Sequence, residues 1–170
     1  MARRMEYTIA FGAPAETVYR EFTSADYWRA LVAEYRRHDP KSELSRFDSG
    51  AHGTEVVLVQ HIARRELPPV ARQVLPADLV ITRTQRFEPF DPRAGTAQGS
   101  YAATVPHAPG RLGGRYHLGT AADGSRLRVT NECKVHVPLL GGKLEELVLR
   151  ALRDLFAAEE AFTAEWIRGR

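Results

Sequence analysis

The sequence predicts an α+β fold, in which a curved antiparallel sheet of seven strands wraps around one long C-terminal helix. Three observations predict this class. Apolar residues recur at three- and four-residue steps from residue 143 to residue 167, where nothing breaks a helix. Most of the preceding chain alternates apolar and polar residues with the two-residue period of strands. Two short helical patterns interrupt that alternation after its first strand, so helices and strands share one domain.

The chain is long enough for one domain with a sizeable core. It has 170 residues, 44% of them apolar, and it shows no linker, internal repeat or low-complexity tract. We therefore expect a single domain over residues 1–170. No apolar run reaches the ~18 residues of a membrane span, and the first residues form no apolar signal core. The lone Cys133 fits a reducing compartment, so a cytoplasmic protein without an integral span is expected.

The first strand and two short helices open the chain. A strand is expected at residues 4–11, because apolar and polar side chains alternate there. A short helix over residues 15–22 follows it, with a proline just before its start. Thr23-Ser24 can cap a second helix over residues 25–34.

Strands make up most of the remaining chain. The connection at residues 65–76 carries three prolines and room for one helical turn, so it runs over the surface or over a cavity mouth. The last strand is the clearest, since its apolar and polar residues alternate throughout. The six further strands are predicted at residues 42–48, 54–62, 79–87, 95–105, 111–120 and 126–137.

The long helix needs a large apolar partner surface. At a rise of about 1.5 Å per residue it is roughly 35–40 Å long, about the width of a small domain. Its charged residues, Glu145 and Glu146 among them, are expected to face away from the sheet. Ala151 and Ala158 should mark where a ligand or a strand comes nearest. The stripe expected to face the sheet consists of Leu144, Leu147, Val148, Ala151, Leu155, Ala158, Phe162 and Trp166.

Composition and motifs argue against several classes of function. The net charge of +3 comes from basic residues spread along the chain as short doublets, such as Arg36-Arg37 and Arg64-Arg65, which favours a solvated surface over a nucleic-acid site. The six histidines lack the spacing that places two ligands on one face, so no metal is expected. Neither a nucleophile elbow nor a phosphate-binding loop is present, and no catalytic residue is predicted.

Three polar side chains on predicted strands are candidates for a pocket. Tyr101 and Tyr116 each combine an apolar ring with a hydroxyl that needs a partner when buried, so they either line a pocket and bond a ligand or pack in an ordinary core. Arg83 shares the phase of Leu79. It either brings a charge into the pocket to meet a carboxylate or enolate, or points into water. His117 is a conceivable base, but no acidic residue is placed to orient it.

The order of elements resembles the helix-grip fold shared by START domains, the birch-pollen-allergen family and the polyketide cyclases, and more narrowly a START-like family common in actinobacteria. Tyr7 in the first strand, the segment from Thr23 to Trp28 and the segment from Pro138 to Trp166 carry the resemblance. It covers essentially the whole chain. It implies a hydrophobic tunnel between sheet and long helix that holds a lipid, sterol, polyketide or other aromatic molecule.

Small residues on the candidate walls agree with such a tunnel, because they either leave volume unfilled or let elements approach closely. On strands they are Gly99, Ala102, Ala103, Gly113 and Gly114, and on the helix Ala151, Ala157, Ala158 and Ala161.

We therefore expect a protein that binds or carries a hydrophobic or amphipathic small molecule without a cofactor. One alternative is a polyketide cyclase- or dehydratase-like enzyme, in which a polar candidate residue stabilises an enolate or moves a proton. Another is a protein-interaction or stress-response module with an incidental cavity. Oligomeric state is not predicted. The expected ligand-binding residues are Arg83, Tyr101, Tyr116, Leu147, Ala151, Leu155 and Phe162.

Overall fold

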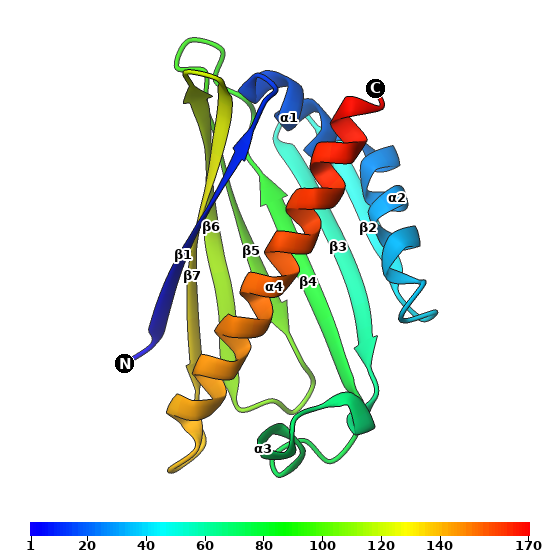
Figure 1. Cartoon of the computed structure of the whole chain (residues 1–170), viewed down its shortest axis with the longest axis vertical. Helices are drawn as coiled ribbons and strands as arrows, with labels where there is room; N and C mark the ends of the chain where they lie inside the picture. Colours follow the sequence, from blue (N-terminus) through cyan, green and yellow to red (C-terminus); the bar gives the residue numbers. More distant parts are fainter.

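A computed structural model describes all 170 residues and confirms the predicted fold class (Figure 1). Two short helices lie between the first two strands, and one long helix closes the chain. The strands are β1 (Arg3–Phe11), β2 (Glu43–Gly50), β3 (Gly53–Ile62), β4 (Leu79–Phe87), β5 (Ala97–Thr104), β6 (Gly110–Ala121) and β7 (Gly124–Val135). The helices are α1 (Ala15–Phe22), α2 (Ala25–Tyr35), α3 (Pro69–Arg72) and α4 (Gly141–Arg168), with a 3₁₀ turn at Arg64–Glu66.

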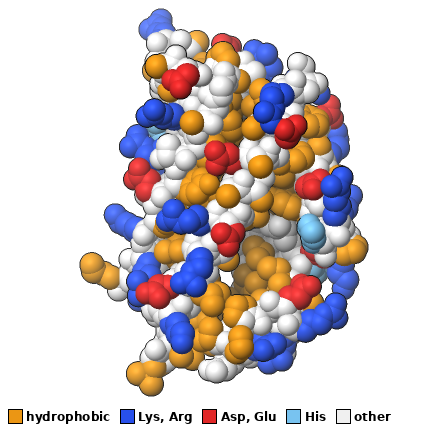
Figure 2. Space-filling view, viewed as in Figure 1, with side chains coloured by type: hydrophobic (Ala, Val, Ile, Leu, Met, Phe, Trp, Pro, Cys, Tyr) orange, Lys and Arg blue, Asp and Glu red, His pale blue; other side chains and the backbone are white.

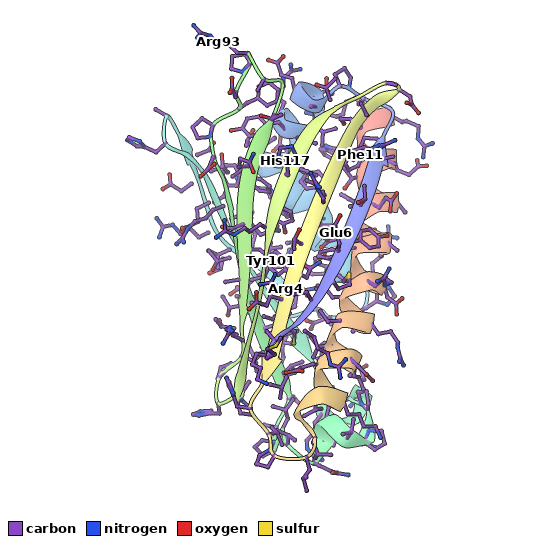
Figure 3. The ribbon with its side chains drawn as sticks, turned by 90° about the vertical axis from the view of Figure 1, so that its left-hand side faces the viewer. Arg4, Glu6, Phe11, Arg93, Tyr101 and His117 are labelled. Atoms are coloured by element: carbon purple, nitrogen blue, oxygen red, sulfur yellow. The ribbon has the colours of Figure 1, made fainter.

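The seven strands form one antiparallel sheet in the order β1-β7-β6-β5-β4-β3-β2. Strands β2 to β7 lie side by side in chain order. The first strand, β1, pairs with β7 over its whole length, from Arg3 opposite Cys133 to Phe11 opposite Ser125. The sheet curves around α4, which runs along it beside β1 (Figures 1 and 3). The first and last strands therefore give the helix its nearest support.

One face of the sheet points toward α4, and the two-residue alternation of each strand decides which side chains lie there. On β7 this inner face carries Leu127, Val129, Asn131 and Cys133, all buried, while the residues between them face solvent or the rim. This agrees with the alternation predicted for the last strand. None of the four helices is both long and apolar enough to cross a membrane.

The buried face of α4 differs from the predicted one by a rotation of roughly one residue. Ala151 and Ala158, expected to lie nearest the sheet, are exposed, whereas Glu145 is only 3% exposed. Glu145 accepts a hydrogen bond from the peptide N–H of Val135 at 2.8 Å, so a carboxylate that resembled a solvent-facing charge fixes the start of the helix. The buried residues of α4 are Gly141, Leu144, Glu145, Leu149, Leu152, Phe156 and Thr163.

The reason for the rotation lies in what α4 touches. It approaches β7 and β1 most closely, and α2 near its C-terminal end. The predicted apolar stripe, with Val148, Leu155 and Phe162, forms one flank of the helix and is half-buried. That flank lies toward β3, β4 and α2, since Glu159 and Phe162 contact side chains of β4 and α2.

Two apolar clusters divide the interior. The larger cluster of 23 buried residues is rich in aromatic rings in the upper half, the end that carries α1, α2 and the C-terminal end of α4, and it continues down β1, β7 and α4 to Met5, Cys133 and Leu149 (Figure 1). The second cluster lies in the lower half, at the end that carries α3 and the N-terminal end of α4, and has only Leu67, Ala71 and Leu144 as buried members. Eight half-buried apolar residues surround these three: Ile62, Val70, Val74, Leu75, Leu79, Val135, Val137 and Leu140.

Candidate functional site

A small pocket, the central pocket, lies between the sheet and α4 in the upper half. Its free volume is about 40 Å³, and ten of its fourteen lining residues are hydrophobic. Since one water molecule needs roughly 10–15 Å³ of such volume, the pocket has room for a few waters and not for a lipid. The polar residues that line it are Gln85, Glu159, Glu160 and Thr163.

Tyr101 and Tyr116 help to fill the upper half. Their ring centroids are 5.7 Å apart, and Tyr116 stacks on Phe87 at 5.6 Å. The hydroxyl of Tyr101 donates to the side-chain oxygen of Asn131, and that of Tyr116 donates to the side-chain oxygen of Gln85. Burial raises the pKa of both hydroxyls well above the ordinary value, so neither is a base at neutral pH. Tyr116 lines the central pocket, while Tyr101 packs beneath it.

Two of the small strand residues make room for these rings. A Cβ at Gly114 would lie 2.5 Å from the ring of Tyr101, and one at Gly99 would lie 3.3 Å from the ring of Tyr116. The glycines therefore allow tight packing of the tyrosines against the sheet and leave no volume unfilled. Of the two roles expected for small residues on the strands, Gly99 and Gly114 therefore have the second, which is to let neighbouring groups approach closely.

Arg83 points inward, which settles the alternative that the sequence left open. It is 3% exposed, and its Nη2 donates to Oε1 of Glu159 on α4 at 2.7 Å. Tyr35 on α2 also donates to Glu159, and Arg83 Nη2 lies 3.4 Å from the Tyr35 hydroxyl. Burial alone would lower the pKa of Arg83, but Glu159 beside it raises that pKa above the ordinary value, so the guanidinium stays charged.

The Arg83 guanidinium is incompletely bonded. Its Nε and Nη1 are buried, and no protein group accepts a hydrogen bond from either. A guanidinium has five N–H donors, of which Nε carries one and Nη1 two. Buried polar groups without a partner are rare because each costs about 1–3 kcal/mol. Its ion-pair partner Glu159 lines the central pocket, and Arg83 shares the inner face of β4 with Leu79 and Ile81.

The sequence analysis missed Glu159 and Tyr35. Both come from helices, and their meeting with Arg83 depends on how α2 and α4 cross the sheet. A signal for Glu159 was present. It lies on the helix flank that carries Leu155 and Phe162, three or four residues from each, where a charged side chain is unusual without a partner.

An apolar hollow opens below this ion pair. In Figure 2 it lies on the right of the lower half of α4, with hydrophobic side chains on its wall. Leu79 and Ile81 share the inner face of β4 with Arg83, because side chains alternate along a strand. Both are half-buried, and Ile81 packs against neither apolar cluster. An inward-facing isoleucine without a packed neighbour cluster indicates that the sheet and helix are not in full contact here.

The other predicted site residues lie around this gap. Leu155 and Leu147 are half-buried, and Phe162 packs on Tyr27 with ring centroids 5.8 Å apart. Ala151 is exposed on the same flank. Their role in binding a ligand stays a prediction.

His117 is placed away from the space between sheet and helix. It lies on β6 (Figure 3), one residue from the buried Tyr116 and therefore on the outer face, where its Nδ1 is 2.9 Å from Nε2 of Gln98. Its proposed part in proton transfer inside a pocket is wrong for this reason.

Metal and thiol chemistry find no support in the arrangement of side chains. No group of three or more His, Cys, Asp or Glu residues converges in a way that could hold a metal ion. Cys133 is 2% exposed, and burial raises the pKa of its thiol to about 11. A thiol that stays protonated and covered is a packing residue.

Comparisons with known proteins agree with the fold. The family model described as protein of unknown function (DUF2505) matches residues 6–167. An uncharacterized protein of Mycobacterium tuberculosis H37Rv is 34% identical over 172 residues, which cover 98% of this chain and 98% of the relative. A protein of Mycobacterium bovis is similar to the same extent.

Solved structures with low sequence identity share the architecture. A Thermus thermophilus protein has a TM-score of 0.58 at 16% identity, with 99% of this chain and 98% of that one covered. A START superfamily protein of Mycobacterium smegmatis has a TM-score of 0.50 at 14% identity, with coverage of 96% and 98%. Norcoclaurine synthase from Thalictrum flavum, in complex with dopamine and hydroxybenzaldehyde, has a TM-score of 0.50 at 11% identity, with coverage of 100% and 88%.

These likenesses confirm the START-like helix-grip fold and, at such identities, nothing finer. The family model matches residues 6–167 and the mycobacterial relative is 34% identical over 98% of the chain, so the chain belongs to the family described as protein of unknown function (DUF2505).

Proposed function

We propose that this protein binds a hydrophobic or amphipathic small molecule, such as a lipid, sterol, polyketide or aromatic compound, between the sheet and α4. The observation that carries the proposal is the apolar hollow of the lower half, where inward-facing residues such as Leu79 and Ile81 remain half-buried (Figure 2). Apolar surface that faces the interior and still meets water gains about 25 cal/mol for each Å² that a ligand covers.

The central pocket is too small to be the whole site, so the body of the ligand occupies the lower hollow. We place its walls at the half-buried, inward-facing Leu79 and Ile81 of β4, between the lower part of α4 and the α3 segment. Norcoclaurine synthase, a protein of similar fold, has been solved in complex with dopamine and hydroxybenzaldehyde, which supports the binding of a small molecule by this fold. The buried Cys133 is in keeping with a reducing compartment, and we place the function in the cytoplasm.

Recovery of a ligand tests the proposal. Native mass spectrometry of the purified protein, followed by solvent extraction and mass analysis, should show a bound small molecule. The variant Ile81→Trp fills the hollow and should lose that mass while it keeps the fold. Ala102→Trp is the matched control, because Ala102 is exposed on the neighbouring strand β5, and it should keep the ligand.

Equal ligand content in the parent and Ile81→Trp would contradict binding in the hollow. Absence of any bound molecule, together with failure of added lipids and aromatic compounds to bind, would favour a protein-interaction module with an incidental cavity.

A cyclase-like enzyme is the second candidate function, and one observation favours it. Arg83, Glu159 and Tyr35 converge, so a charge stabiliser, a carboxylate and a proton donor lie together. Burial and the adjacent Glu159 raise the pKa of Tyr35 well above its ordinary value, which keeps that hydroxyl protonated. Under this proposal the recovered ligand should be converted by the parent to an isomer with a different chromatographic retention time, or to a product lighter by one water, and should stay unchanged with Glu159→Gln.

A further inference from the structure

The unpaired N–H donors of Arg83 bear on the chemical class of the ligand. Every hydrogen bond that the Arg83 side chain makes to protein runs through Nη2, which contacts Glu159 and Tyr35. Nε and Nη1 lie on either side of that contact, are buried, and find no acceptor in the protein. An interior built only for stability would satisfy or replace such donors, because each unmet group is costly.

The charge of the guanidinium is already balanced, and this decides between acceptors. Glu159 contacts Nη2 at 2.7 Å and is itself only 17% exposed, so the pair is close to neutral as a unit. A ligand carboxylate at Nε or Nη1 would place a second anion within a few Å of Glu159 in a poorly solvated site, which is unfavourable. A neutral oxygen acceptor meets the same donors without that repulsion.

The surroundings favour the same choice. The hydroxyls of Tyr101 and Tyr116 are used within the sheet, on Asn131 and Gln85, and burial keeps both protonated. The hydroxyl of Tyr27 is 2.7 Å from Oγ1 of Thr163. The tyrosine hydroxyls around Arg83 are thus already paired within the protein, whereas Nε and Nη1 of Arg83 are not.

We propose that the ligand is a neutral amphipathic molecule whose ketone, ester or similar carbonyl oxygen accepts hydrogen bonds from Nε and Nη1 of Arg83, with its apolar body in the lower hollow. This inference rests on the proposed binding function and specifies its ligand class. Arg83 is the polar end of the site, and Glu159 holds it in place and cancels its charge.

Three small probes that share a phenyl ring and a short chain separate the possibilities. Butyrophenone carries a neutral carbonyl, butylbenzene carries no polar group, and 4-phenylbutanoate carries a carboxylate. Their affinities for the full chain are measured by calorimetry. Butyrophenone should bind about tenfold more tightly than butylbenzene, which corresponds to about one charge-assisted hydrogen bond net of its desolvation.

The double variant Arg83→Met/Glu159→Met removes the donors and the carboxylate together, so it leaves no unpaired charge. It should bind butylbenzene as the parent does, with the preference for butyrophenone reduced to one or below. Arg83→Lys is the second variant, because it keeps the pairing with Glu159 but lacks the planar fork, and it should lose most of the preference. Tyr35→Phe leaves the Arg83 donors in place and should retain it.

The outcomes are distinguishable. Equal binding of butyrophenone and butylbenzene to the parent would overturn the carbonyl inference, leave the binding function standing and assign the Arg83 donors to bound water. Tightest binding of 4-phenylbutanoate would overturn it in favour of an acidic ligand. If no probe binds and no ligand is recovered from the purified protein, the proposed function itself fails.

Discussion

The upper and lower halves of the space between sheet and helix are built differently. In the upper half, aromatic rings from α1, α2, β4, β6 and α4 interlock. The ring of Phe22, for example, has four aromatic neighbours with ring centroids within 6.5 Å: Phe11, Tyr27, Trp28 and Phe87. In the lower half the apolar side chains are aliphatic, and most of them are half-buried around the buried Leu67, Ala71 and Leu144. The upper half is therefore packed more fully by its own side chains than the lower half.

The Arg83–Glu159 ion pair marks the boundary between the two halves. Glu159 lines the small central pocket above, while Ile81 and Leu79 continue the β4 face below Arg83. The proposed site therefore uses only the less fully packed half, and four comparisons between variants of the two halves test that division.

The largest effect is expected from truncation in the upper half. Phe22→Ala removes a ring packed on all sides and should reduce the free energy of unfolding by about 3–5 kcal/mol. Ile81→Ala, the counterpart in the lower half, should cost about 1 kcal/mol or less, because its side chain is not closely packed. Urea unfolding followed by circular dichroism measures both. Equal losses would show that the lower half is packed like the upper one.

Separation of the ion pair should give the next largest effect. Arg83→Met leaves Glu159 without its ion-pair partner and should reduce the free energy of unfolding by about 2–3 kcal/mol. This loss is smaller than for a fully buried pair, because Glu159 keeps some contact with water. Arg83→Met/Glu159→Met should recover most of that loss, since no lone charge remains. A double variant as unstable as the single one would mean that the pair itself holds the two halves together.

Loss of a buried hydroxyl should have a smaller effect. Tyr101→Phe leaves the Asn131 side-chain oxygen without its donor and should destabilise the protein by about 1–2 kcal/mol. Tyr19→Phe is the matched control, because the Tyr19 hydroxyl donates to the carbonyl of Glu88 at an exposed position, and it should cost less than about 0.5 kcal/mol. Thermal unfolding of the two variants provides the comparison. A comparable loss in both would contradict the assignment of the Tyr101 hydroxyl to the packed core.

The smallest effect concerns the lower end of α4 and depends on pH. The peptide N–H of Val135, with Lys134 and Arg3 nearby, lowers the pKa of Glu145 below its ordinary 4.5. The folded state therefore binds this proton less tightly than the unfolded state does. The stability that Glu145 contributes is present above about pH 4.5 and is lost as the pH falls through the lower folded-state pKa.

Glu145→Gln should consequently lower the unfolding temperature at about pH 7. The difference in unfolding temperature between about pH 7 and pH 3 should also be smaller than in the parent. Differential scanning calorimetry at several pH values measures the change. Glu146→Gln is a suitable control, since the Glu146 side chain is 56% exposed and pairs only with Arg3. If both variants respond to acid as the parent does, Glu145 does not fix the helix in the way described.

Particular residues show how far the sequence could predict this site. The alternation of β7 placed Leu127, Val129 and Cys133 on the inner face correctly, because a strand buried on one side leaves a strict pattern. The same reasoning could not decide the phase of β4, where Val80 and Ile81 are both apolar. The sequence pattern allowed both positions for Arg83 and favoured solvent, which is wrong, because Arg83 is buried against Glu159, 76 residues away.

The long helix illustrates the same limit. Its length and amphipathic character follow from local periodicity, and so does its place over a sheet. Its rotation does not, since the buried Glu145 and the half-buried Glu159 take part in contacts with β7 and β4 that no local pattern encodes. Ala151 and Ala158 were assigned to the wrong side because charge was taken as a sign of exposure.

By itself the sequence determined the order and bounds of the elements, the antiparallel sheet, the closing helix and the apolar character of the space between them. These features depend on local propensity and on burial periodicity, which each segment carries alone. The tertiary structure decided which half of that space is filled, where Arg83 points and what neutralises it. Those outcomes depend on the angle at which α4 crosses the sheet and on side chains that meet from distant parts of the chain.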